Sequence, residues 1–275
     1  MSQYQISCFF DHILEAAEQS GKNVPEILKL CREWKISALE INNQTLVNNP
    51  DYEKIIQDAG FSYNCLYDFY DWDSSTDFAK AKDHIDRANR LNCRKILIVP
   101  GFFTEDEAKQ FEDCSDYKKT CEKLESSPKS VQIKQMLCKA VQYASEKNIT
   151  VTIEDFDDKK SPVCKTNQIL WYLQNVPGLK WTFDTGNFEY SAENALNSYE
   201  KLKSYIANVH TKDRGPYLSS VPTGSGILPV TEILQKIKKD FSEMNFSIEH
   251  FGASSQLDFL QKSATYLVQN LFTSQ

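Results

Sequence analysis

Four side chains that can bind a metal ion or move a proton each follow an apolar, β-branched segment in the second half of the chain. They are Glu154 in TIEDF, Asp184 in TFDTGN, His210 in NVHTKD and Glu249 in SIEHFG. Gathering three carboxylates and one imidazole in a half-buried space costs free energy, because the like charges of the carboxylates repel one another. A divalent cation offsets that repulsion. An oxygen-rich set with one imidazole suits Mn²⁺, Mg²⁺, Co²⁺ or Zn²⁺. If the four residues converge, we expect them to hold one divalent metal ion.

Taken singly, each of these residues has an ordinary structural explanation. An acid at a strand end is usually a helix cap or is solvated, and a lone histidine is more often structural than a ligand. The four residues, however, occupy the same position in four successive units of the chain. That repetition favours a shared site.

Strand-like segments alternate with amphipathic helical segments along the whole chain. The segments that carry strands are residues 4–10, 37–42, 61–69, 94–101, 149–153, 178–187, 206–213 and 245–252. The expected helices are residues 24–35, 51–60, 75–92, 129–148, 166–176, 192–205, 229–241 and 255–272, with Ser75 or Thr76 as the N-cap of the third. Parallel strands need crossover helices, and eight such units are the size of an α/β (β/α)₈ TIM barrel. A doubly wound sheet is the alternative, but no G-x-G-x-x-G follows the first strand.

This barrel prediction explains why the four residues meet, because the C-terminal ends of all barrel strands open onto one mouth. We expect a single domain over residues 1–275, since no Pro-, Gly- or Ser-rich linker divides the chain. A charged segment at about 101–128, between the fourth strand and the fourth helix, is the one long interruption. It is either a helical insert or a plain surface excursion, and it is a candidate contact in a homo-oligomer.

The composition excludes several classes of protein. The net charge of −7 argues against general nucleic-acid binding, which depends on Lys and Arg. No signal-peptide pattern and no apolar run long enough to span a bilayer occurs, so we expect a cytoplasmic protein without a membrane partner. The eight cysteines are scattered without a C-x-x-C motif, which indicates buried reduced thiols and not a zinc site through sulfur.

The order Glu, Asp, His, Glu, together with FDTGN, VHTKD and IEHFG, resembles the xylose-isomerase-like TIM barrel superfamily of sugar phosphate isomerases and epimerases. The resemblance covers essentially the whole chain and is strongest over residues 149–252. It implies that Glu154, Asp184, His210 and Glu249 hold a divalent metal and that Glu154 and Glu249 are also the acid/base pair. The implied activity moves a proton next to a carbonyl of a small ketose or polyol-derived substrate.

Three positions depart from the ketose 3-epimerases of that superfamily. Asn187 stands where those enzymes carry His, Lys160 where they carry a second Glu, and Pro216 where they carry Arg, although Arg214 lies close by. The H-x-K-D motif at 210–213 resembles other members of the superfamily, which include inosose dehydratases and many sugar-phosphate isomerase-like proteins. A dehydratase on the same metal site is therefore one alternative, and a non-catalytic sugar-binding barrel is another. The apurinic-site endonuclease branch needs many histidines, and the chain has four.

The candidate substrate contacts are Asn187, Lys212, Arg214 and Glu40. Lys212 either polarises a substrate oxygen or is a surface ion-pair partner, and Asn187 either bonds a hydroxyl or supports the turn after Gly186. Glu40 ends the second strand, where we favour support of a ligand over direct contact. The amides of the GSG loop at 224–226 either cradle a phosphate or belong to a flexible connector.

Overall fold

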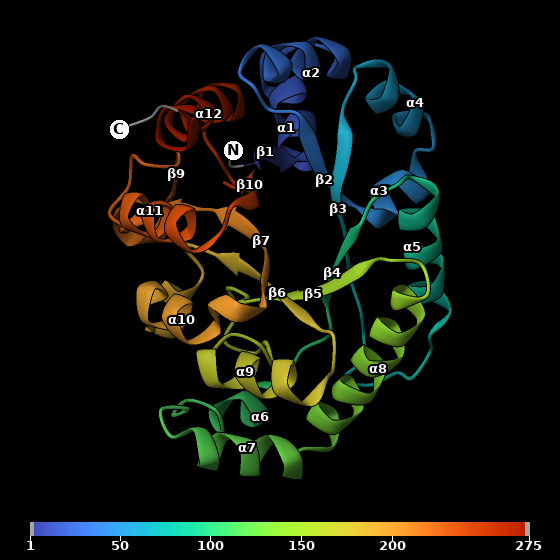
Figure 1. The fold of residues 1–275 in the computed structure, drawn as a ribbon, viewed down its shortest axis with the longest axis vertical. Helices are drawn as coiled ribbons and strands as arrows, with labels where there is room; N and C mark the ends of the chain where they lie inside the picture. The colour runs from blue at the N-terminus through green and yellow to red at the C-terminus, as the bar shows by residue number, and fades with distance from the viewer. Residues whose placement is uncertain (1–2, 273–275) are drawn as a thin grey trace. The chain divides into compact units, whose positions relative to one another are not determined.

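The computed structural model, which describes residues 3–272, contains a closed barrel of eight strands with surrounding helices (Figure 1). The barrel strands are β1 (Gln3–Phe9), β2 (Ala38–Asn42), β3 (Ser62–Phe69), β4 (Lys95–Val99), β5 (Thr150–Glu154), β6 (Lys180–Asp184), β7 (Ile206–Thr211) and β10 (Glu243–Ile248). Their order around the barrel is β1-β10-β7-β6-β5-β4-β3-β2, so each strand neighbours the next one along the chain. The (β/α)₈ prediction is confirmed, and each predicted strand segment overlaps one barrel strand.

Helices separate these strands throughout the chain. The α-helices are α1 (Phe10–Ser20), α2 (Val24–Glu33), α3 (Asn43–Asn48), α4 (Asp51–Asp58), α5 (Ala79–Arg90), α6 (Glu105–Lys109), α7 (Tyr117–Ser126), α8 (Pro128–Ser145), α9 (Thr166–Asn175), α10 (Ala195–Leu202), α11 (Val230–Asp240) and α12 (Gln256–Phe272). Short 3₁₀ helices are η1 (Phe188–Ser191), η2 (Lys203–Tyr205) and η3 (Pro216–Leu218). A two-stranded antiparallel sheet is formed by β8 (Asp213–Arg214) and β9 (Ser220–Val221). None of the described helices is long and apolar enough to cross a membrane.

The chain divides into two compact units, of which the first comprises the described residues up to 65 and from 208 onward. In this unit α1 packs against α2 and α12 (Figure 1). The apolar positions Phe10, Ile13 and Ala16 of α1 are buried at helical spacing, which is why this segment is helical. The prediction had no helix here, because the first strand runs into the helix without an intervening turn residue.

The second unit comprises residues 66–207 and contains the charged segment between β4 and α8. That segment is helical, since it holds α6 and α7, and α7 packs against α8 and α9. The predicted cap of α5 at Ser75 or Thr76 is wrong. The helix begins after Phe78, and the amide of Ala79 donates instead to Asp77 Oδ1 at 2.9 Å.

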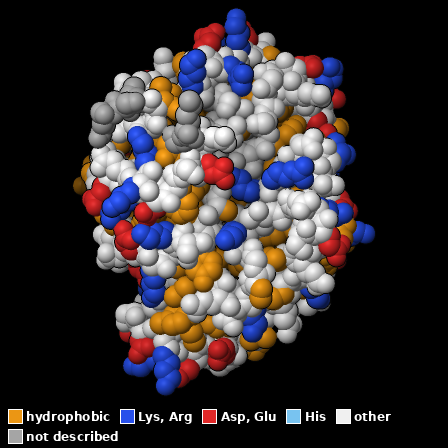
Figure 2. All heavy atoms as spheres, in the orientation of Figure 1, with side chains coloured by type: hydrophobic (Ala, Val, Ile, Leu, Met, Phe, Trp, Pro, Cys, Tyr) orange, Lys and Arg blue, Asp and Glu red, His pale blue; other side chains and the backbone are white. Residues whose placement is uncertain are grey.

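The surface and the thiols agree with the composition. None of the eight cysteines forms a disulfide, and six of them are buried. On the face of the molecule that Figure 2 shows, Lys and Arg side chains are mingled with Asp and Glu.

Candidate metal centre

Four potential ligand atoms, one each from Glu154, Asp184, His210 and Glu249, lie within 4.8 Å of one another. All four residues are buried. Glu154 and Asp184 are the last residues of β5 and β6, His210 is the penultimate residue of β7, and Glu249 directly follows β10. The four residues thus lie at the ends of successive parallel strands of the barrel, as predicted. These strand ends bring the side chains together from distant parts of the sequence.

In the first unit, the imidazole of His210 lies between two carboxylates. Its Nδ1 is 2.9 Å from Glu249 Oε2, and its Nε2 is 3.0 Å from Glu40 Oε2. The ring of Phe9 packs edge-on against the imidazole, with ring centroids 5.0 Å apart. Both ring nitrogens and the ring itself are therefore in contact with protein groups, which fixes the orientation of the imidazole.

The carboxylate of Glu40 is the centre of a buried polar network. Its Oε1 accepts hydrogen bonds from Asn64 Nδ2 at 2.8 Å, Asn208 Nδ2 at 2.7 Å and Ser247 Oγ at 2.6 Å. Burial raises the pKa of Glu40, but the charge and hydrogen bond of His210, with the bonds from Ser247 and Asn208, outweigh it and lower the pKa. Glu40 is therefore an ionised carboxylate with both oxygens engaged by protein groups, as support of His210 requires.

Lys212 is buried, with only 4% of its side chain exposed, and its Nζ is 2.5 Å from Glu249 Oε1. The alternative of a surface ion pair is therefore wrong, because the ion pair is internal. Burial raises the pKa of Glu249, but the neighbouring Lys212 ammonium and the His210 imidazole hold it well below its usual range. Glu249 is thus ionised at neutral pH and has a charged donor beside it.

The loop after β7 is organised by Asp213. Its Oδ2 accepts hydrogen bonds from the amides of Gly224 at 3.0 Å and Gly226 at 2.8 Å, and its Oδ1 accepts from the amide of Arg214 at 2.8 Å. The amides of Gly224 and Gly226 are therefore occupied by a carboxylate, and the amide of Ser225 donates to the carbonyl of Pro222 at 2.9 Å. The alternative of a phosphate cradled by these amides is therefore wrong. Arg214 is buried, and its Nη1 donates to the carbonyl of Leu218 at 3.4 Å.

In the second unit, Asp155 connects the ends of β5 and β6. Its Oδ1 accepts from Trp181 Nε1 at 3.0 Å and from the amide of Asp184 at 2.9 Å. Burial, followed by the charges of Asp184 and Glu154, raises the pKa of Asp155 well above its usual value. Glu154 and Asp155 are both buried, so the ordinary explanation of an acid at a strand end as a solvated group is wrong for these two residues.

Asn187 lies next to the same strand ends and is buried. Its Nδ2 donates to the carbonyl of Asp155 at 2.8 Å and to Glu154 Oε1 at 3.4 Å. Gly186 donates its amide to Asp184 Oδ1 at 2.7 Å, so this turn positions both candidate ligands.

Asn64, Asn208 and Asp155 also belong to the site, although they were not predicted. A signal existed for Asn208, because it lies two positions before His210 in the same strand, and side chains at that spacing point to the same face. Asn64 has no candidate site residue two positions away in its strand, so the same reasoning does not single it out. Asp155 carried no separate signal, since an acid directly after a strand is ordinary.

Comparison with known proteins now places the chain in a family. The model of the family described as xylose isomerase-like TIM barrel matches residues 28–269. The chain therefore belongs to the xylose isomerase-like TIM barrel family, as its resemblance implied. None of the curated proteins compared matches its sequence.

Several solved structures share the fold over nearly the whole chain. The probable 3-DHS dehydratase AsbF of petrobactin synthesis from Bacillus anthracis is 17% identical, with a TM-score of 0.70 over 98% of this chain and 99% of its own. D-allulose 3-epimerase from Methylomonas sp. is 14% identical, with a TM-score of 0.70 over 98% and 99%. The IOLI protein, solved with a bound zinc atom, is 14% identical, with a TM-score of 0.72 over 98% and 100%. At these identities the likeness establishes the fold.

Proposed function

We propose that this protein is a divalent-metal-dependent isomerase or epimerase of a small ketose or polyol-derived carbohydrate. The observation that carries the proposal is the buried set of three carboxylates and one imidazole with ligand atoms within 4.8 Å of one another. Buried carboxylates at such spacing repel unless a cation offsets their charge, so the donor set fits a metal ion. Glu154, Asp184, His210 and Glu249 would hold it, and the bound ion would stabilise negative charge on substrate oxygens as a Lewis acid.

The protein's own groups supply the rest of the chemistry. Glu249 is ionised and can accept a proton, while the ammonium of Lys212 at 2.5 Å compensates its charge. Asn187 orients Glu154 through the 3.4 Å contact to Oε1. Two glutamates allow one to remove a proton next to a carbonyl and the other to return it, which is the requirement of an epimerase. Arg214 is the remaining candidate for contact with substrate oxygens.

A dehydratase on the same site is the second candidate, and the position of Lys212 favours it. In an elimination, this buried ammonium would be the acid that protonates the leaving hydroxyl. Conversion of ketoses and inososes in D₂O, followed by NMR, separates the two reactions. An isomerase or epimerase incorporates solvent deuterium into a product of the same formula, whereas a dehydratase releases water.

The metal content of the purified protein tests the proposal directly. We expect about one equivalent of Mn, Co, Mg or Zn in the wild type and loss of the metal in Glu154→Gln, Glu249→Gln, because the variant removes two anionic ligands. The matched control is Glu18→Gln, Glu33→Gln, which changes the charge equally at exposed positions. If the wild type stays metal-free after dialysis against Mn²⁺ and Co²⁺, the proposal is contradicted. The alternative of a non-catalytic sugar-binding barrel is then favoured.

A further inference from the structure

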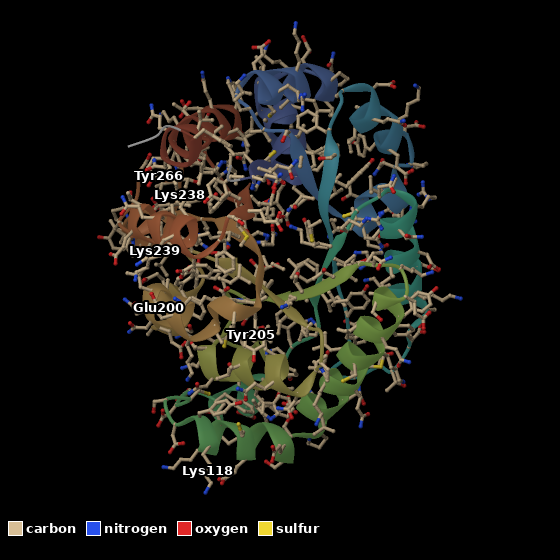
Figure 3. The ribbon with its side chains drawn as sticks, in the orientation of Figure 1. Lys118, Glu200, Tyr205, Lys238, Lys239 and Tyr266 are labelled. Carbon is tan, nitrogen blue, oxygen red and sulfur yellow. The ribbon has the colours of Figure 1, made fainter. Side chains whose placement is uncertain are left out.

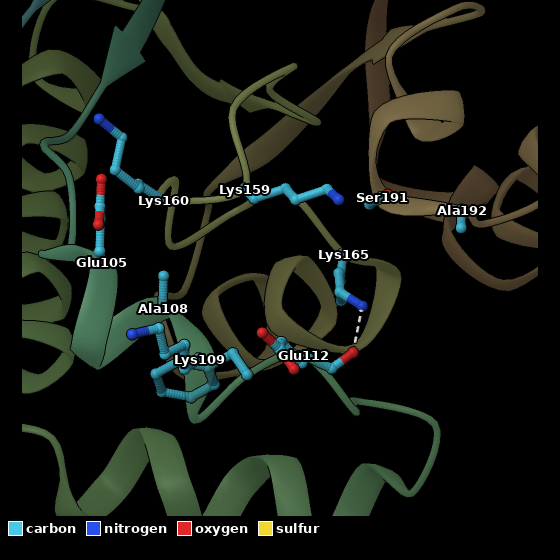
Figure 4. Close-up of a pocket in the computed structure, with 10 residues that line it drawn as sticks. Glu105, Ala108, Lys109, Glu112, Lys159, Lys160, Lys165, Ser191 and Ala192 are labelled. Carbon is cyan, nitrogen blue, oxygen red and sulfur yellow. Dashed lines mark hydrogen bonds between the residues drawn. The ribbon is translucent and has the colours of Figure 1, made fainter.

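A cavity whose lining includes none of the candidate metal ligands lies in the second unit and is bordered by lysines. Its volume is about 480 Å³, within the range of small-molecule sites. The lining includes Lys109 of α6 and Lys159, Lys160 and Lys165 of the segment between β5 and α9 (Figure 4). Ala108, Phe111 and Ala192 supply apolar surface. We propose that this cavity, the lysine pocket, binds the phosphate or carboxylate group of a small organic anion.

The lysine pocket has walls that the protein holds in place. The amide of Phe103 donates to the carbonyl of Lys160 at 2.8 Å, and Lys165 Nζ donates to the carbonyl of Glu112 at 2.6 Å (Figure 4). On the third side, the amide of Thr166 donates to Glu193 Oε2 at 2.8 Å. These bonds connect the helical insert, the segment after β5 and the segment after η1. Such a preformed cavity costs little ordering when a ligand binds.

The charge in the lysine pocket is only partly neutralised by the protein. Lys109 pairs with Asp106 at 2.7 Å, but that pair is exposed, and Lys160 is 3.8 Å from Asp158. Lys165 bonds a neutral carbonyl. Lys159 forms no ion pair with the described residues, and Figure 4 shows its side chain extending toward Ser191.

Two carboxylates, Glu105 and Glu112, also line the cavity, so its titratable lining carries four positive and two negative charges. A positive excess is unusual in a chain whose net charge is −7. A lining that combines cationic and apolar side chains suits an anionic group on a carbon skeleton, because the ammonium groups bind the oxygens while the apolar side chains contact the carbons.

Calorimetric titration of the purified protein tests this inference. The probes are ribulose 5-phosphate, citrate and inorganic phosphate, with neutral ribulose for comparison. We expect at least one anionic probe to bind more tightly than ribulose and to lose about tenfold or more in affinity in Lys159→Gln, Lys165→Gln. The matched control is Lys118→Gln, Lys119→Gln on α7, where Lys118 points outward from the helix (Figure 3). The control should bind as the wild type does.

Three results would overturn the inference: no anionic probe binds at millimolar concentration, the Lys159→Gln, Lys165→Gln variant binds normally, or the control loses as much affinity. Circular dichroism of both variants excludes unfolding as the cause of a loss. A repeat with Glu154→Gln, Glu249→Gln separates two sources of the anion. Weaker binding there identifies the anion as one end of a molecule that also reaches the metal centre, and unchanged binding identifies a separate effector. The result of the binding experiment therefore does not depend on whether the protein catalyses the proposed reaction.

Discussion

The two ring nitrogens of His210 face carboxylates with different surroundings. Glu249 Oε2 faces Nδ1 and belongs to the candidate ligand set, whereas Glu40 Oε2 faces Nε2 from within a network of buried amides and a hydroxyl. A carboxylate that accepts from the second nitrogen fixes the tautomer and raises the basicity of the first. We infer that Glu40 acts through His210 and does not contact substrate.

Glu40→Gln tests this role at the scale of a single residue. The variant keeps the volume and loses the charge that polarises His210, so we expect metal affinity to fall by about 10- to 100-fold while the fold persists. Titration of Mn²⁺ or Co²⁺ into metal-free protein measures the affinity, and Glu33→Gln is the exposed control. Equal affinities of Glu40→Gln and wild type would show that Glu40 has no part in metal binding.

At the scale of elements, α5 is secured by a buried histidine. His84 Nδ1 is 2.9 Å from the hydroxyl of Tyr70, and His84 is fully buried. Burial is the largest effect on this imidazole and lowers its pKa to about 4. The folded protein therefore holds His84 neutral in a range where the unfolded chain, with a histidine pKa of about 6.5, is protonated.

This difference predicts a loss of stability in mild acid. The unfolded state binds more protons between pH 6.5 and pH 4, so the contribution of His84 is complete above about pH 6.5 and declines as the pH falls. Between pH 7 and pH 5 the decline should be about 2 kcal/mol. Urea unfolding at both pH values measures it, with His84→Leu as the comparison. If the variant loses as much stability as the wild type over this range, His84 is not responsible.

At the scale of the whole molecule, the eight strands close one barrel although the chain divides into two compact units. The boundaries between the units fall within β3 and β7, so a unit on its own would expose unpaired strand edges, which are unfavourable in water. We propose that residues 1–275 form a single cooperative domain.

A single unfolding transition is the expected result. Trp34 belongs to the first unit and Trp72, Trp171 and Trp181 to the second, so fluorescence of Trp34→Phe reports on the second unit alone. Its urea midpoint should coincide with the far-ultraviolet circular dichroism midpoint of the same variant. If the fluorescence and circular dichroism midpoints differ, the two units unfold separately and the proposal of a single cooperative domain is wrong.

The sequence by itself determined the eight strands, the barrel and the positions of Glu154, Asp184, His210 and Glu249 at the strand ends. Those features follow from local periodicity and from the rule that parallel strands end on one side. The binding of a divalent metal ion by these four residues remains a prediction.

Only the tertiary structure decided which groups surround these residues. It brought Asn64 and Asn208 to Glu40 across 24 and 168 residues of chain and buried Lys212 against Glu249. It also built the lysine pocket from the insert and the segment after β5. The physical reason is that hydrogen bonds and ion pairs depend on packing between segments distant in the chain, whereas periodicity records only which face of its own element a residue occupies.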